Sequence, residues 1–203
     1  MSHKKHAPAT QRNKTPILNV LKDILPDNGQ FLEIASGTGE HCVYFAGHFP
    51  SLTFHPSDID PAALESIDAH ARETDLDNIR PAIALDASTP ELWPVKDIDI
   101  IICINMIHIA PWEATTGLFK GAGAVLNDDG KLITYGPYFD SAVETAPTNA
   151  SFHRSLKARD KRWGLRDLKD IQSIAEEHNF SFEHKIAMPA NNDILVFEKK
   201  SGT

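Results

Sequence analysis

Short apolar runs alternate with amphipathic stretches along the first half of the chain. Apolar residues recur at helical spacing between 16 and 25, and Thr15 with Pro16 is typical of a helix start. Strands are predicted at 30–35, 52–57 and 79–85, with helices at 37–49 and from Asp60 onward between them. Because Pro81 cannot donate to a strand ladder, the strand at 79–85 is expected at a sheet edge.

The second half continues the alternation and ends in a hairpin. The most apolar run, at 98–104, is typical of a parallel strand covered on both faces. A helix at 112–126, a turn at 127–130 and a strand at 131–135 follow, and residues 136–163 are interpreted as irregular. Another amphipathic helix covers 165–175, and strands at 180–188 and 193–199 form the hairpin.

This order predicts an α/β fold, a doubly wound, Rossmann-like sheet. It is expected to have seven strands, mostly parallel, with one antiparallel strand from the C-terminal hairpin. The domain organisation that we expect is a flexible N-terminal arm at 1–14 followed by a single domain at 15–203.

Composition and charge exclude several classes of protein. Of 203 residues, 41% are hydrophobic and 24% charged, which is the balance of an ordinary globular protein. A net charge of −8 argues against general nucleic-acid binding, and the chain lacks both an apolar run long enough for a membrane helix and a secretory signal. Cys42 and Cys103 have no CxxC spacing, so we expect a cytoplasmic location, and the histidines show no metal-binding spacing.

A glycine-containing turn follows the first predicted strand and carries the clearest chemical signal. It runs from Glu33 through Ala35, Ser36 and Gly37 to Gly39, and such a turn lets a ligand approach the backbone. Asp58 ends the second strand 19 residues after Gly39, where an acid can accept hydrogen bonds from ribose hydroxyls. Taken alone, the glycines are as compatible with a simple tight turn as with a nucleoside site.

The details of this turn distinguish between cofactors. A dinucleotide site has a third glycine where this chain has Cys42. The Glu33 carboxylate would repel a pyrophosphate and suits a cationic ligand. S-adenosylmethionine carries an ammonium and a sulfonium and no phosphate, so it fits this pattern.

The motifs resemble those of class I S-adenosylmethionine-dependent methyltransferases. The segment 33–39 is similar to their first motif, Asp58 with Ile59 to the second, Asp86 with Ala87 to the third, and Asn105 to the start of the fourth. The resemblance implies S-adenosylmethionine as cofactor, S-adenosylhomocysteine as product and no metal. The cofactor-binding residues that it implies are Glu33, Ala35, Ser36, Gly37, Gly39, Asp58, Ile59, Asp86, Ala87 and Asn105.

Further phrases narrow the resemblance to one family. They lie at 12–18, 105–112, 135–138 and 159–167, and together they look like the domain-of-unknown-function family that includes methyltransferase-like protein twenty-six.

Three polar residues after the fourth and fifth strands are the catalytic candidates: Asn105, His108 and Tyr138. Asn105 could orient a nucleophile, and His108 could accept a proton near neutral pH. A His108 bonded only to backbone is an equal alternative. Tyr135 continues the apolar pattern of its strand, so we expect it in the core.

Arg159 and Arg162 lie in a basic segment at 154–166, and Arg12 and Asn13 lie in the N-terminal arm. These four are the substrate candidates, since the basic segment could form a lid over an anionic acceptor and the arm could close from the other side. The segment could equally be a solvated helical face.

The leading hypothesis is a methyltransferase for a small-molecule acceptor, with a nucleic-acid partner disfavoured by the net charge and no membrane partner. A protein or RNA acceptor stays open through the basic segment at 154–166. One alternative is a non-catalytic S-adenosylmethionine-binding scaffold. Another is a nicotinamide-dependent oxidoreductase, which Glu33 and the missing third glycine disfavour. The oligomeric state has no signature in the sequence.

Overall fold

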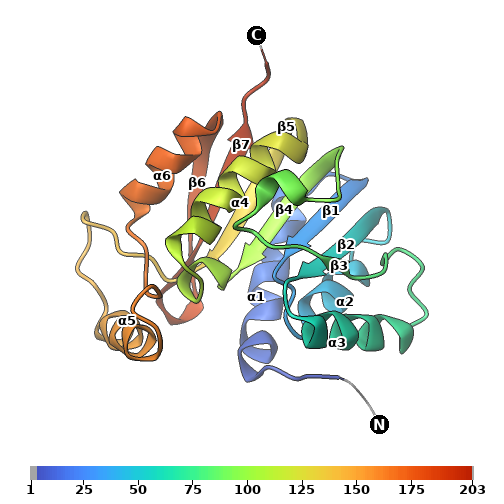
Figure 1. Cartoon of the computed structure of the whole chain (residues 1–203), viewed down its shortest axis with the longest axis horizontal. Helices are drawn as coiled ribbons and strands as arrows, with labels where there is room; N and C mark the ends of the chain where they lie inside the picture. Colours follow the sequence, from blue (N-terminus) through green and yellow to red (C-terminus); the bar gives the residue numbers. More distant parts are fainter. Residues whose placement is uncertain (1–3, 203) are drawn as a thin grey trace.

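A computed structural model describes residues 4–202 of the chain. Its centre is a seven-stranded sheet with the order β3-β2-β1-β4-β5-β7-β6 (Figure 1). The pairs from β3 to β5 are parallel, and β7 runs antiparallel to both β5 and β6. The predicted fold class, including the single antiparallel strand from the terminal hairpin, is confirmed.

The elements of the first half are α1 (Pro8–Ile24), β1 (Gly29–Ile34), α2 (Glu40–Ala46), β2 (Leu52–Asp58), α3 (Pro61–Arg72) and β3 (Ile83–Ala84). Asp60 caps α3, since its side chain accepts a hydrogen bond from the Ala62 amide at 3.0 Å. The edge position of the third strand is confirmed, although it contains only two paired residues and a separate bridge joins Phe54 to Ile79.

The second half contains β4 (Ile98–Ile104), α4 (Trp112–Val125), β5 (Leu126–Gly136), α5 (Pro147–Arg159), α6 (Leu168–Glu177), β6 (Phe180–Met188) and β7 (Asn192–Lys199). Single turns of 3-10 helix lie at η1 (Pro90–Leu92), η2 (Met106–His108) and η3 (Pro189–Asn191). The predicted turn at 127–130 lies inside β5, where Asp129 has a φ of 61° and the pairing with β4 shifts register.

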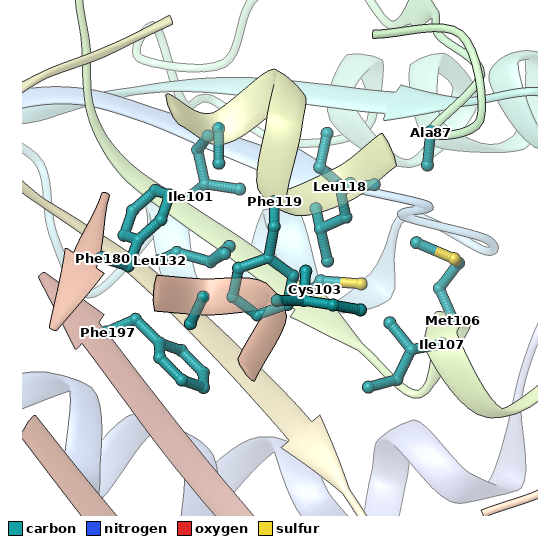
Figure 2. Close-up of a cluster of buried hydrophobic side chains, with 14 of the residues drawn as sticks. Ala87, Ile101, Cys103, Met106, Ile107, Leu118, Phe119, Leu132, Phe180 and Phe197 are labelled. Atoms are coloured by element: carbon teal, nitrogen blue, oxygen red, sulfur yellow. The ribbon is translucent and has the colours of Figure 1, made fainter. Parts of the chain in front are cut away.

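Two hydrophobic cores lie on the two faces of the sheet. Helices α4 and α6 cover one face, and α1 and α2, with α3 beside α2, cover the other (Figure 1). In the first core, Phe119 of α4 contacts Phe197 of β7 edge to face, with ring centroids 5.1 Å apart (Figure 2). Strand β4 contributes to both cores, as its uniformly apolar sequence predicts.

The expectation of a flexible arm at 1–14 is not what the described part shows, because α1 begins at Pro8 and not at Thr15. The first turn is held by the Glu40 carboxylate, which accepts hydrogen bonds from the Ala7 backbone amide at 2.9 Å and from the Gln11 side-chain Nε2 at 3.0 Å. Upstream, the Lys5 amide donates to Ser66 of α3 at 2.8 Å. These contacts stabilise a helix that has Pro16 in its interior; residues 1–3 lie outside the described part.

The interpretation of 136–163 as irregular was wrong for α5, a helix of 13 residues. Only Asn149 and Leu156 of this helix are buried, so its sequence has no apolar stripe for a periodicity argument to detect. Figure 1 shows α5 set apart from the sheet. No helix within residues 4–202 has the length and apolar character that spanning a bilayer requires.

Candidate cofactor and acceptor site

The carboxyl ends of β1, β2 and β4 lie together at one edge of the sheet. Ala35 follows β1, Asp58 ends β2 and Asn105 follows β4. Because doubly wound sheets bind ligands at this edge, the motifs singled out in the sequence converge where a site is expected.

The turn after β1 depends on left-handed backbone conformations. Ala35, Gly37 and Gly39 have φ values of 56°, 59° and 87°. A Cβ on Gly39 would lie 2.7 Å from the Cα of Ile67 in α3, so only glycine fits there. Ala35 carries a side chain in this conformation at a cost of roughly 1 kcal/mol, and the Ser36 hydroxyl donates to the Glu33 carbonyl at 3.3 Å.

Asp58 is fixed by backbone donors on both sides. Its Oδ2 accepts from the Gly37 amide and its Oδ1 from the Asp60 amide, each at 2.9 Å. The next residue, Ile59, is 64% exposed, which leaves an apolar surface beside an oriented carboxylate. This pairing suits a ligand with a hydroxylated ring joined to a flat apolar one.

Glu33 is an ionisable side chain with an unsatisfied buried atom. Its side chain lies beneath the turn, and its Oε2 is buried without a hydrogen-bond partner. Burial is the main cause that raises the pKa of Glu33 to about 8; the Asp58 charge adds to it, and a hydrogen bond from Ser36 opposes it. A buried acceptor without a donor is costly, so Glu33 is suited to a cationic or hydrogen-bond-donating group.

A cavity of about 580 Å³ opens beside the turn and α4, and we call it the α4 cavity. Ala35, Ile59, Asp86 and Ala87 are among its lining residues. The Asp86 Oδ1 accepts from the amide and hydroxyl of Ser88 at 2.8 and 2.7 Å, which orients the carboxylate.

These residues fit S-adenosylmethionine. The unsatisfied Glu33 oxygen suits its ammonium, the fixed Asp58 carboxylate its ribose hydroxyls, and exposed Ile59 its adenine. Of the implied cofactor residues, Ala35, Ile59, Asp86 and Ala87 line the cavity itself. Glu33, Ser36, Gly37, Gly39 and Asp58 form the adjoining turn and strand ends.

A second cavity, of about 610 Å³, lies between α1 and α5, and we call it the α1–α5 cavity. Arg12 and Asn13 of α1, Asn105 after β4 and Tyr135 of β5 line it. Ile109 lines both cavities, and Asn105 and Met106, one in each lining, are neighbours in sequence. The loop after β4 therefore separates two adjoining spaces.

The structure separates the three catalytic candidates. Asn105 lines the α1–α5 cavity in a left-handed conformation, with a φ of 64°, and its amide donates to the Tyr135 carbonyl at 2.8 Å. His108 is 1% exposed and neither ring nitrogen has a hydrogen-bond partner. Burial, with the nearby Arg166 charge, lowers the pKa of His108 to about 3, so an imidazole in this state is a poor proton acceptor at neutral pH.

Tyr138 lies in the core and does not line either of these cavities. Its hydroxyl donates to Thr134 Oγ1 at 2.7 Å, its ring packs against His108, and burial raises its pKa. Tyr135 is 4% exposed and packs in the second core, as expected, and it also lines the α1–α5 cavity. Tyr138 lies three residues beyond Tyr135, so the alternation of an extended chain places it on the opposite face, in the core beneath α4 and α6.

The four substrate candidates lie in two different places. Arg12 and Asn13 line the α1–α5 cavity. Arg162 lines the α4 cavity, where it forms an ion pair with Asp160 at 2.7 Å, and Arg159 stacks on Trp163 at 4.9 Å from the ring centroid. The structure therefore does not bring the two pairs of candidates together around one acceptor.

Sequence reasoning weighed Tyr135 and assigned it to the core, interpreted His41 as structural and gave Trp163 no role of its own. The His41 Nε2 contacts the Asn13 Oδ1 at 2.8 Å, and Trp163 lines the α4 cavity. The alternation of side chains along β5 could have identified Tyr135, since Ile133 and Tyr135 share a face. His41 and Trp163 depend on tertiary contacts that no local pattern reports.

The sheet order and the helices on its two faces define a Rossmann-like fold. The chain belongs to DUF938, a family of proteins of unknown function, whose family model matches residues 4–199.

Solved structures with a similar fold are methyltransferases of low sequence identity. An O-methyltransferase family protein from Burkholderia thailandensis is 15% identical with a TM-score of 0.80, over 96% of this chain and 58% of that one. An O-methyltransferase family 2 protein from Planctomyces limnophilus, in complex with apigenin, is 18% identical (TM-score 0.77, 94% and 60% covered). Human N-acetylserotonin methyltransferase, in complex with S-adenosylmethionine, is 14% identical (TM-score 0.74, 95% and 53%). The chain thus spans little more than half the length of these proteins.

Proposed function

We propose that this protein is an S-adenosylmethionine-dependent methyltransferase for a small-molecule acceptor. One observation carries the proposal: the α4 cavity, beside the nucleoside-type motifs, adjoins a second cavity across the loop that contains Asn105, Met106 and Ile109. A methyl donor and its acceptor need two such adjoining spaces.

Each part of the cofactor has a matching residue. The Asp58 carboxylate would accept hydrogen bonds from the ribose, and Ile59 and Ala87 would contact the adenine, with Asp86 accepting from its amino group. Glu33 and the turn amides would hold the methionine end. When bound, the cofactor would supply a methyl group activated by its sulfonium, while the protein contributes position and electrostatics.

Several finer assignments belong to the same proposal. The family is the one that includes methyltransferase-like protein twenty-six, on the support of the phrases at 12–18 and 105–112. Cys42 and Cys103 are buried and unpaired, which supports a cytoplasmic location. The apigenin complex of the Planctomyces protein supports a small molecule as the acceptor.

Calorimetric titration of S-adenosylhomocysteine tests the proposal. Wild type should bind one molecule, Asp58→Ala and Glu33→Gln should bind at least about tenfold more weakly, and Glu183→Gln, an exposed acid on β6, should match wild type. No heat of binding at millimolar ligand would refute the proposal. Cofactor binding without methyl transfer to any acceptor in a metabolite extract would favour the scaffold alternative.

A further inference from the structure

The α1–α5 cavity has one charged side chain in its lining. Among its described lining residues that charge is the Arg12 guanidinium; the polar remainder consists of Asn13, Asn105, Tyr135 and a few amide and hydroxyl side chains. The lining includes no carboxylate, imidazole, amine or thiol. Its side chains can therefore bind and orient an acceptor, and none of them is suited to remove a proton from it at neutral pH.

The rest of the wall is apolar and stiff. Phe152 of α5 and Ile109 are 41% and 44% exposed, and Pro16, Pro137 and Pro189 complete this surface. Phe152 and Ile109 are among the few large apolar side chains exposed in the described part of the chain. Exposed apolar groups that face a cavity favour a ligand with an apolar body.

The His41 and Asn13 side chains determine whether the Tyr135 hydroxyl donates or accepts a hydrogen bond toward the cavity. The Asn13 Oδ1 cannot donate, so the His41 Nε2 donates to it across 2.8 Å. The Asn13 Nδ2 is then the donor that remains on this amide, and the Asn13 side chain lowers the pKa of Tyr135, as a donor to the phenol oxygen does. The Tyr135 oxygen accepts, and its own proton is available to a ligand in the cavity.

The protonation states agree with this direction. Burial lowers the pKa of His41 to about 4, so the ring is neutral and has one proton to donate. Burial also raises the pKa of Tyr135, against smaller lowering effects of Asn13 and the Arg12 charge. At neutral pH the phenol therefore keeps the proton that it would donate.

We propose that the acceptor is a small organic anion with an apolar body, whose anionic oxygen lies between the Arg12 guanidinium and the Tyr135 hydroxyl. Asn13 and His41 are positioning residues that direct the Tyr135 proton toward that oxygen. The inference rests on the proposed function and names the acceptor class. It assigns anion recognition to Arg12 in the first turns of α1, whereas the sequence had suggested the basic segment at 154–166.

Calorimetry with 2-naphthoate and its neutral isostere 2-naphthamide tests the acceptor class. On protein saturated with S-adenosylhomocysteine, naphthoate should bind at least about tenfold more tightly than naphthamide. Arg12→Gln should abolish that preference and Tyr135→Phe should reduce it, whereas Lys22→Gln, an exposed cation in the last turn of α1, should preserve it. Equal binding of the two probes, no binding of naphthoate, or an unchanged preference in Arg12→Gln would overturn the inference.

The S-adenosylhomocysteine titration is done first on the same samples, so that failure of the proposed function can be distinguished from failure of the acceptor inference. If S-adenosylhomocysteine does not bind, the proposed function fails, and the naphthoate preference is then measured on the free protein. If it binds and naphthoate does not, only the acceptor inference fails.

The positioning role has its own measurement. NMR of a labelled Tyr135 Cζ should give a higher phenol pKa in Asn13→Ala and in His41→Phe than in wild type. Asn13→Ala removes the donor to the phenolate, and His41→Phe removes the group that orients this donor. If Asn13 instead accepts the Tyr135 proton, the pKa in Asn13→Ala will fall, and this result would overturn the proposed direction. Melting temperatures of both variants identify any that fail to fold, and Asn13→Ser then replaces Asn13→Ala with the same expected sign.

Discussion

The backbone amide of Gly37 donates a hydrogen bond of 2.9 Å to the Oδ2 of Asp58. This bond joins the turn after β1 to the end of β2, so the acid that would hold the ribose also holds the turn beneath it. Binding and local stability therefore share one carboxylate.

Replacing Asp58 separates these two roles. Asp58→Ala leaves the Gly37 and Asp60 amides without their acceptor and should lower the free energy of unfolding by about 1–3 kcal/mol. Asp58→Asn keeps one side-chain oxygen, so it should cost less stability than Asp58→Ala. It should still weaken the binding of S-adenosylhomocysteine. Urea denaturation and calorimetry on both variants measure this, and equal stability of Asp58→Ala and wild type would contradict the structural role.

Glu33 predicts a pH dependence of cofactor binding. Its carboxyl is protonated in the free protein below pH 8, because burial raises its pKa to about 8, whereas a cationic ligand favours the carboxylate. Affinity for S-adenosylhomocysteine should therefore rise as the pH increases from 6 to about 8, with proton release on binding. Glu33→Gln should bind weakly with no such rise, and a wild-type affinity that is flat over this range would contradict the account.

The same residue predicts a gain in stability when it is replaced. A carboxyl whose folded pKa is raised stabilises the fold most below its unfolded value of 4.5, and that contribution is lost as the pH rises to about 8. In ligand-free protein at pH 8, Glu33→Gln should therefore raise the free energy of unfolding, by about 1–3 kcal/mol. Thermal unfolding at pH 5 and pH 8 should show the gain only at the higher pH.

Glu40 predicts the opposite behaviour. Burial alone would raise its pKa, but hydrogen bonds from the Ala7 amide and from the His6, Thr38 and Gln11 side chains lower it to about 2. Stability from Glu40 is present above pH 4.5 and should be lost as the pH falls toward 2. Glu40→Gln should be less stable than wild type at pH 7, by about 1–2 kcal/mol, with protease cleavage before Pro8 accelerated. Glu176→Gln, an exposed acid on α6, should change neither property.

Tyr138 and Tyr135 predict contrasting effects of the same substitution. Tyr138→Phe removes the hydrogen bond to Thr134, so it should cost about 1 kcal/mol of stability and leave ligand binding unchanged. Tyr135→Phe removes the acceptor of the Asn13 amide, so it should cost a similar amount of stability and should in addition weaken binding of anionic ligands in the α1–α5 cavity. Denaturation and naphthoate titration of both variants decide between them, and weakened binding in Tyr138→Phe would return that residue to the site.

Local chemistry was enough to predict much of the sheet. The run at 98–104 identified a strand buried on both faces, Pro81 placed its strand at the edge, and Asp60 with Pro61 began α3 as observed. Each depends on residues within one element, where periodicity, proline geometry and capping act directly.

Tertiary contacts determined what the sequence did not predict. Residues 8–14 are helical with the support of Glu40 and α3, and α5 has no apolar stripe. The burial of His108 depends on Gly136 of β5, whose missing side chain leaves room for the His108 ring: a Cβ there would lie 2.2 Å from the His108 Nε2. Contacts between distant segments of this kind leave no local pattern to read.

A crystal structure of the S-adenosylhomocysteine complex tests the central claim most directly. The account predicts adenine between Ile59 and Ala87 in the α4 cavity, ribose hydroxyls on Asp58, and the thioether sulfur beside Asn105, facing the α1–α5 cavity. A ligand bound elsewhere, or one whose sulfur faces away from the α1–α5 cavity, would contradict it.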